Sequence, residues 1–420
     1  MKLRYLFFSL MALIAFGACS NEDDIIDNNI PKEPVDAYIS FVAKSNTQTR
    51  SITDGKGEQN LNNETKITRL TALIFDAATR KRVAYQDETN QNGISEIKDI
   101  LIKVTPVDEK GGATNDKFYA VLVANATDNV ASIYSMDDFN TVVVTKSCDQ
   151  YQVGDVLPMA SDTIQFTGVR PTVKKTENGT TQTTKNENWI KSSASAFIYT
   201  EATQQAAGTI ALNRLVARIQ VDKITVSFQE ETYKNAEFKL TRLWLANARS
   251  VSSINSINNP SYVYYKGYES AMFDKLKPEE RAGWIQPGSE VKTGLRKGYT
   301  GNYVTGLVGD WTDNSAIDKF FRYTFANPGK GDNVNVYETA LVISGFFKNA
   351  GIEEERHFRV LLKDNDEPIK VKSNHVYRIE VIITGEGSRD EDNIEMNAYV
   401  SATVVANPWQ TVDQAENDAN

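Results

Sequence analysis

The sequence predicts an all-β protein built from β-sandwiches, and three observations support this fold class. Short runs of apolar and β-branched residues alternate with stretches rich in Gly, Asn, Asp and Pro, the pattern of short strands joined by turns. Residues 209–228 alternate apolar and polar side chains with a period of about 2, which a helix would not show. The chain also contains 18 Tyr and 18 Phe, and aromatic residues favour strands.

The strands are expected in two groups, because 420 residues exceed the length of one typical domain. We predict strands at 37–44, 66–75, 94–104, 117–126, 142–144, 163–166, 196–199, 209–228, 238–246, 338–347, 357–362, 376–384 and 398–412. Helical stretches are predicted at 128–137 and 278–282, a loop at 174–188, and irregular structure at 255–312. The long strand ends in Gln229, Glu230 and Glu231, so we predict an N-terminal domain over 36–226 and a C-terminal domain over 227–420.

The first eighteen residues have the features of a secretory signal peptide. Lys2 and Arg4 precede an apolar run at 6–16, and small residues follow it. This run is too short to cross a bilayer, which needs roughly 20 apolar residues. Residues 1–18 are therefore predicted to be removed during export.

Gly17 and Ala18 stand directly before Cys19, and this arrangement resembles the lipobox of bacterial lipoproteins. It implies that Cys19 is acylated, for example with palmitate; an ordinary signal peptide is the alternative. The acidic run at 20–24 is similar to the signal that sends Bacteroidota lipoproteins to the outer face of the outer membrane. Residues 19–35 are polar and contain Pro31 and Pro34, so we predict a lipidated tether.

A polar segment with Arg50 near its start follows the first predicted strand. Residues 45–50 are Ser, Asn, Thr, Gln, Thr and Arg, and 51–64 are rich in Gly, Asn and Asp. A trypsin-like protease can reach such a segment. Cleavage between Arg50 and Ser51 is one interpretation, and an ordinary surface loop is the other.

Composition and motifs point away from several classes of function. The net charge of -9 argues against nucleic-acid binding. Once Cys19 is acylated only Cys148 remains, which leaves no intramolecular disulfide. His357 and His375 are expected at the surface or in turns, and we find no known catalytic motif. No enzymatic activity, metal or cofactor is predicted; the acidic segments 364–367 and 390–393 are interpreted as solvated turns rather than Ca²⁺ sites.

Several segments together resemble the fimbrillins, the subunits of Bacteroidales type V pili. They are 66–75, 118–126, 157–161, the basic strand 212–219 with Arg214 and Arg218, and the C-terminal segments 373–379, 384–385 and 404–409. The resemblance spans most of the mature chain. It does not extend to 255–312.

The resemblance implies two transthyretin-like sandwiches with Greek-key topology and a surface lipoprotein precursor that matures into extracellular fimbriae. It implies a shaft subunit that supports adhesion and polymerises by donor-strand exchange, with other copies of itself and related pilin subunits as partners. An Arg-specific extracellular protease would remove the first strand, whose inward residues are Ala37, Ile39, Phe41 and Ala43. The donor strand is expected at about 400–414, with Val400, Ala402, Val404, Val405, Trp409 and Val412.

Two alternatives stay open. The chain could be a surface glycan-binding lipoprotein of a nutrient-uptake system, because Tyr262, Tyr264, Tyr265, Tyr268, Trp284 and Tyr299 form an aromatic cluster in the sequence. It could also be the tip or anchor subunit of the same pilus. The apolar C-terminal strand favours a shaft subunit.

Overall fold

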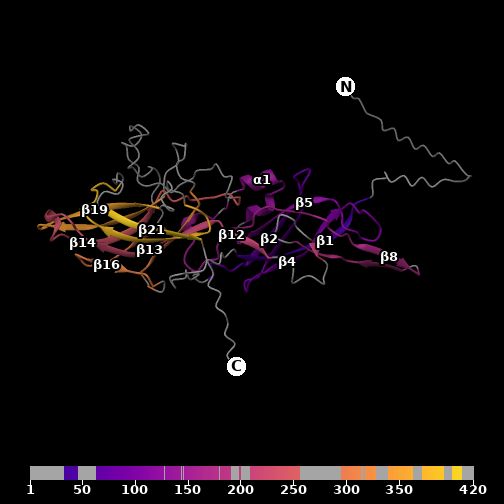
Figure 1. Ribbon diagram of the computed structural model, residues 1–420, viewed down its shortest axis with the longest axis horizontal. Helices are drawn as coiled ribbons and strands as arrows, with labels where there is room; N and C mark the ends of the chain where they lie inside the picture. The colour runs from indigo at the N-terminus through magenta and orange to yellow at the C-terminus, as the bar shows by residue number, and fades with distance from the viewer. Residues whose placement is uncertain are drawn as a thin grey trace, which may run out of the picture. The chain divides into compact units, whose positions relative to one another are not determined.

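The computed structural model of the chain is almost entirely β, as predicted (Figure 1). It describes residues 33–45, 63–126, 128–142, 144, 146–178, 180–190, 198–199, 209–255, 295–313, 316, 318–327, 339–362, 371–391 and 400–408. One short helix, α1 (Met136–Thr141), and a few 3-10 turns accompany the strands in this part of the chain. No helix in the described ranges is long and apolar enough to cross a membrane.

Ten strands of the first half form one connected sheet, in the order β11-β10-β1-β12-β6-β5-β2-β3, with β4 paired to β1 and β7 paired to β5. They are β1 (Val35–Ser45), β2 (Arg69–Asp76), β3 (Arg82–Thr89), β4 (Glu96–Val104), β5 (Lys117–Ala124), β6 (Met159–Ala160), β7 (Ile164–Thr167), β10 (Glu187–Ile190), β11 (Ile198–Tyr199) and β12 (Ile210–Arg214). The hairpin of β8 (Val173–Glu177) and β9 (Thr180–Thr184) forms its own two-stranded sheet.

The connected sheet folds over one apolar core. Alternate residues of β1, β2, β4 and β5 point into this core, because successive side chains of a strand face opposite sides. The other face of β2 and β5 packs into a second core, through residues such as Leu73 and Val123. This first half is therefore a sandwich with apolar residues on both faces of its central strands.

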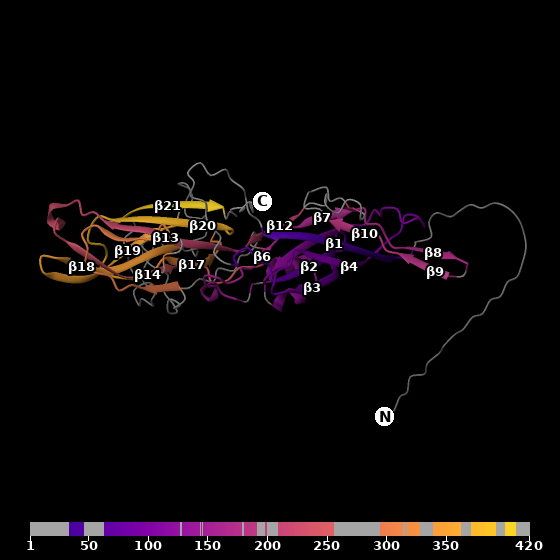
Figure 2. The same ribbon diagram turned by 90° about the horizontal axis from the view of Figure 1, so that it is seen from below.

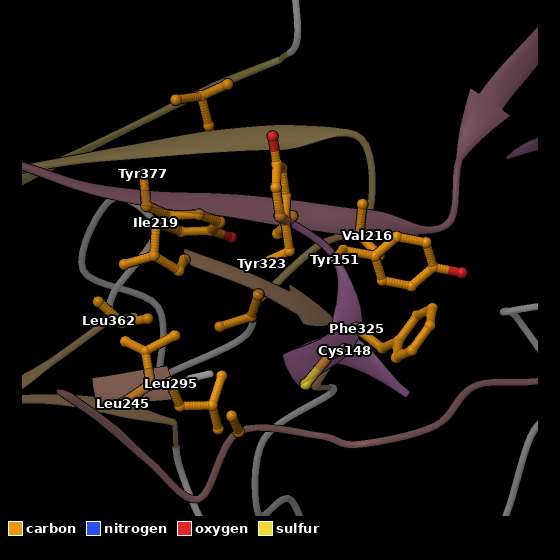
Figure 3. Packing of buried hydrophobic residues seen from close by; sticks show 14 of the residues in the cluster. Cys148, Tyr151, Val216, Ile219, Leu245, Leu295, Tyr323, Phe325, Leu362 and Tyr377 are labelled. Atoms are coloured by element: carbon orange, nitrogen blue, oxygen red, sulfur yellow. The ribbon is translucent and has the colours of Figure 1, made fainter. Parts of the chain in front are cut away.

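Two further sheets carry the second half, drawn from pink through orange to yellow in Figures 1 and 2. One has the order β16-β13-β20-β21 with β17 also paired to β13, and the other has the order β15-β14-β18-β19. Their strands are β13 (Val216–Val226), β14 (Glu237–Ala246), β15 (Arg296–Gly298), β16 (Leu307–Asp310), β17 (Phe320–Phe325), β18 (Ala340–Asn349), β19 (Ile352–Leu361), β20 (His375–Ile383) and β21 (Val400–Pro408). Figure 3 shows the core between them, where Ile219, Leu245 and Tyr377 converge.

The predicted long strand at 209–228 is two strands in different sheets. Leu215 separates them, and its N–H donates to the carbonyl of Pro158 over 2.9 Å instead of joining either ladder. β12 before it pairs with β1 and β6, whereas β13 after it pairs with β16, β17 and β20. The division into domains at 226 and 227 stays a prediction.

Other elements differ from the prediction for identifiable reasons. No strand forms at 142–144 in the described residues, because the Val144 N–H donates to the irregular segment at Ser252. The predicted loop at 174–188 contains the polar hairpin β8–β9 and the start of β10, and 255–312 contains β15 and β16. The helix predicted at 128–137 is a 3-10 turn followed by α1, which begins after Ser135, whose side chain accepts from the Asp138 N–H. The segment 278–282 lies outside the described residues.

Candidate functional site

The first strand, β1, occupies the interior of a sheet. On one side it pairs antiparallel with β4, from Val35 opposite Val104 to Val42 opposite Glu96. On the other side it runs parallel to β10 along 38–41 and to β12 along 43–45. Both backbone edges of β1 therefore take part in ladders, and we call the space it fills between β4, β10 and β12 the β1 seat (Figure 2).

One face of β1 fills the core of the first half. The four inward residues predicted for this strand, Ala37, Ile39, Phe41 and Ala43, are all fully buried or nearly so. The Phe41 ring packs edge-on against Phe166 at a centroid distance of 6.5 Å. Full burial of an apolar side chain of this size stabilises a fold by about 1.5–3 kcal/mol, so β1 is a structural part of the sandwich.

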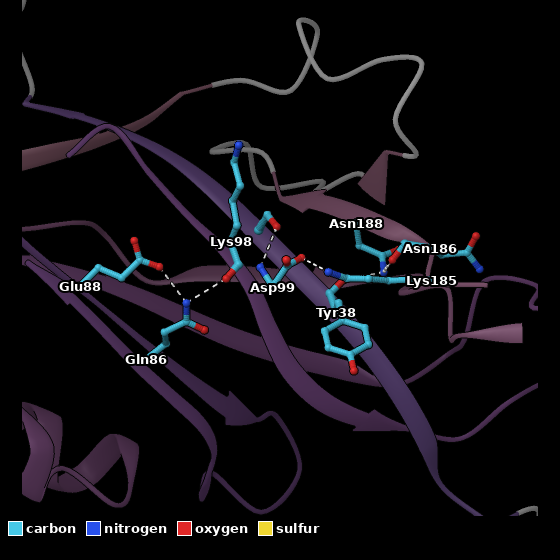
Figure 4. A network of polar contacts seen from close by, with 9 residues as sticks. Tyr38, Gln86, Glu88, Lys98, Asp99, Lys185, Asn186 and Asn188 are labelled. Atoms are coloured by element: carbon cyan, nitrogen blue, oxygen red, sulfur yellow. Dashed lines mark hydrogen bonds and ion pairs between the residues drawn. The ribbon is translucent and has the colours of Figure 1, made fainter. Parts of the chain in front are cut away.

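Polar contacts fix β1 in its seat as well (Figure 4). The side chain of Asn188, itself fully buried, donates from Nδ2 to the carbonyl of Tyr38 over 2.8 Å. Lys185 forms an ion pair with Asp99 of β4, and its Nζ lies 4.5 Å from the centroid of the Tyr38 ring. These contacts were missed by sequence reasoning because they join residues between 86 and 150 positions apart.

The described part of β1 ends at Ser45, and the chain continues at Asn63. The predicted cleavage point, Arg50 and Ser51, lies outside the described residues, as does the predicted lipidation site Cys19. The first charged residue after this segment is Glu64, whose side chain is fully buried. The segment that contains Arg50 is therefore held at both ends by buried structure.

Glu64 is the centre of a buried polar cluster. Its carboxylate accepts from the Arg218 guanidinium over 2.7 Å and from the Tyr323 hydroxyl over 2.6 Å. Its carbonyl accepts from Nε of Arg214 over 2.9 Å, and Arg214 also donates to Asn374. Burial lowers the pKa of Arg214 to about 10, an effect that Glu64 opposes, so the guanidinium stays charged at neutral pH. Glu64 thus connects the chain after the Arg50 segment to β13 and β17.

The last described strand, β21, lies at the edge of its sheet, and within the described part of the chain it pairs with β20 alone. Of the predicted donor residues, Val400 is buried, Val404 is half-buried, and Ala402 and Val405 are exposed, Val405 to 46%. Trp409 and Val412 lie outside the described residues. β21 therefore packs Val400, Val404 and Ala406 against the core of its own half and leaves 401–403 and 405 exposed.

The remaining candidate residues have structural roles. Cys148 is buried, and burial raises the pKa of its thiol well above the ordinary value, with Asp149 adding to the effect. His357 is buried rather than exposed as predicted, and its Nδ1 lies 2.9 Å from the Ser344 hydroxyl. Across the described ranges, no group of three or more His, Cys, Asp or Glu could hold a metal ion. The Tyr299 ring packs on the Trp311 ring at a centroid distance of 5.7 Å. The other members of its predicted aromatic cluster lie outside the described residues.

One family model matches part of the chain. Residues 37–214 match the family model described as the major fimbrial subunit protein (FimA). No curated protein sequence matches the chain.

Solved structures share the fold. A protein described as a cell adhesion protein from Parabacteroides distasonis is 15% identical, with a TM-score of 0.60 and coverage of 90% of this chain and 98% of that one. A fimbrilin from Porphyromonas gingivalis is 17% identical, with a TM-score of 0.58 and coverage of 90% and 99%. The match over 37–214 and this shared fold agree with the resemblance to fimbrillins seen in the sequence.

Proposed function

We propose that this chain is a structural subunit of a cell-surface fimbrium, made as an outer-membrane lipoprotein and assembled by donor-strand exchange after cleavage behind Arg50. In this proposal Cys19 carries the acyl chains, β1 fills its own seat in the precursor, and an Arg-specific protease releases it. A C-terminal strand from another subunit then fills the vacated seat. The matched family and the fold shared with a fimbrilin support the class of function.

The observation that carries the proposal is the position of β1. It is the first described strand, it lies inside a sheet, and its C-terminal end leads directly into the segment with Arg50. One cut in that segment would separate the central strand from the rest of the fold. A strand in such a position suits replacement, because all the strands that pair with it, β4, β10 and β12, follow it in the chain.

Loss of β1 would leave the subunit in need of a substitute. The backbone groups of β4, β10 and β12 that pair with β1 would lose their partners, and the buried neighbours of Phe41 would face water. Exposed strand edges with apolar side chains bind added strands readily. This physical demand supports a shaft subunit that both accepts and donates a strand.

The same proposal assigns roles to the two halves of the chain. Strands up to Arg214 build the accepting half, and strands from Val216 build the half that ends in β21. We place the change between the halves at Leu215, before the predicted boundary at 226 and 227. The exposed side of β21 supports a donor function for the C-terminus, which would distinguish a shaft subunit from a tip subunit.

The test is the Arg50→Ala variant, followed by N-terminal sequencing of protein recovered from the cell surface. Wild-type protein should begin at Ser51, and the variant should stay an unassembled precursor because its own strand competes at high effective concentration. Arg389→Ala is the matched control, since Arg389 is an exposed arginine with an ion pair to Glu354 at 3.4 Å. Filaments of Arg50→Ala at the wild-type level would contradict the proposal.

A further inference from the structure

The β1 seat contains a feature that specifies which strand fits it and in which register. Between the pairs Ile39–Ile100 and Phe41–Ile97, β1 has one residue, Ser40, and β4 has two, Lys98 and Asp99. This extra residue makes a β-bulge in β4. Asp99 has a φ of 61°, the left-handed conformation that asparagine and aspartate adopt more readily than most residues.

The bulge directs a backbone donor at the strand in the seat. The Asp99 N–H donates to the Ser40 hydroxyl over 3.2 Å, and Ser40 is buried. Asp99 itself is exposed, so a strand without a hydroxyl at this position would lose a partly buried hydrogen bond and leave that N–H to water. The seat therefore favours a Ser or Thr at one position, with apolar residues directly before and after it.

The same pattern occurs twice in the chain. Residues 37–43 read Ala-Tyr-Ile-Ser-Phe-Val-Ala, and residues 400–406 read Val-Ser-Ala-Thr-Val-Val-Ala. Both have apolar residues at the first, third, fifth and seventh positions and a hydroxyl at the fourth. In the second segment that hydroxyl belongs to Thr403, between Ala402 and Val404.

We propose that residues 400–406 of one subunit occupy the place of residues 37–43 in the next, with Thr403 at the position of Ser40. This inference rests on the proposed donor-strand exchange and specifies its register. The direction follows from the bulge, which is a feature of antiparallel pairs. The incoming strand therefore runs antiparallel to β4, as β1 does, and places Val404 where Phe41 lay.

Burial favours the transfer. In β21 the residues Ser401, Ala402, Thr403 and Val405 are exposed, whereas the matching residues of β1, Tyr38, Ile39, Ser40 and Val42, are all buried or half-buried. A strand at an exposed edge thus moves to a position between two neighbours. The apolar surface that it removes from water increases, and this is the favourable term.

Side-chain size explains why cleavage comes first. Ala402 and Val404 are smaller than Ile39 and Phe41, so the donor fills the seat less completely than β1 does. β1 also remains covalently attached before the cut, which gives it a high effective concentration. The donor can therefore enter only after β1 has been released.

The register is tested by disulfide formation between subunits. Val42 lies opposite Glu96, so Val405 of the donor should lie opposite Glu96 of the acceptor. Full-length Glu96→Cys and Val405→Cys chains are co-expressed in cells without the wild-type protein, and surface filaments are collected. Directly opposite residues are close enough for a disulfide, while diagonal neighbours about 7–8 Å apart are too far.

We expect covalent dimers in most junctions between the two variants, and none when either variant is expressed alone. Thr403→Cys and Asn407→Cys, combined with Glu96→Cys, test registers shifted by two residues. Filaments linked through residue 403 or 407, or through none of the three, would overturn the register while donor-strand exchange stands. Absence of filaments from wild-type cells would overturn the proposed function and the register with it.

A second pair of variants tests the hydroxyl. Thr403→Val has nearly the same shape without the acceptor, and Thr403→Ser keeps the acceptor. Filaments of Thr403→Val should dissociate about threefold to tenfold faster than wild-type filaments on mild heating in detergent, as expected for the loss of one partly buried hydrogen bond. Filaments of Thr403→Ser should match the wild type. Equal dissociation rates for Thr403→Val and wild type would show that the Asp99 N–H does not select the donor.

Discussion

Replacing Glu64 with Ala should destabilise the precursor more than any exposed charge change. Glu64 and Arg218 are both fully buried, their atoms Oε2 and Nη1 lie 2.7 Å apart, and Tyr323 donates to the same carboxylate. Removing one partner of a buried ion pair costs about 3–5 kcal/mol, because the other charge stays in the interior. Typical folds are stable by about 5–15 kcal/mol, so this one change would remove a large share of the stability.

The measurement is equilibrium unfolding in urea, with Glu64→Gln and Glu231→Ala beside it. Glu64→Gln keeps an acceptor for Tyr323 and should lose less than Glu64→Ala. Glu231 forms an exposed pair with Lys234 at 3.4 Å, and such pairs are worth about 0–1 kcal/mol. A loss below about 1 kcal/mol for Glu64→Ala, equal to that of Glu231→Ala, would refute the view that this cluster stabilises the fold.

Three further outcomes follow from other parts of the chain. Cys19→Ala should abolish surface display, measured by antibody labelling of intact cells, because acyl chains supply about 0.8 kcal/mol of membrane affinity per buried CH₂; labelling at the wild-type level would contradict lipidation. Phe41→Ala should lower the free energy of unfolding of the precursor by about 3–5 kcal/mol and speed hydrogen exchange in β4. Val42→Ala, at a half-buried position, should change both quantities little. Burial lowers the pKa of His357, although Glu391 and Glu355 oppose this. As the pH falls, the unfolded chain therefore binds a proton at this residue before the folded chain does, so the free energy of unfolding should decrease below about pH 6.5. The His357→Gln variant should show a weaker decrease.

The strands that could be predicted are those whose apolar residues alternate. β1 and β20 were found for this reason, and the inward residues of β1, including Phe41, are buried as expected. β3 and the hairpin β8–β9 were missed because their residues are mostly polar and exposed or half-buried. An exposed strand is held by backbone ladders, and these leave little trace in side-chain composition.

The site could be predicted only in part. The alternation at 37–43 identifies which side chains of β1 face the core, but it does not identify the neighbours of β1, since β4 and β10 pair with it from distant parts of the chain. The Ser40 hydroxyl accepts a hydrogen bond that only the bulge in β4 makes available, and the Glu64 carboxylate pairs with Arg218, 154 positions away. Contacts of this kind depend on the tertiary fold, which no local pattern encodes.

The short break at Leu215 has a mechanical consequence for a filament. β12 is bonded to the strand in the seat and β13 to β20, while Leu215 is the only residue between β12 and β13. In the proposed filament β21 has left β20 for the next subunit, so tension that enters through the strand in the seat passes through β12, Leu215 and β13 to β20, and then along the connection 384–399 to the donor strand. The load bypasses the other long connections of both halves, so those connections can vary in length without weakening the fibre.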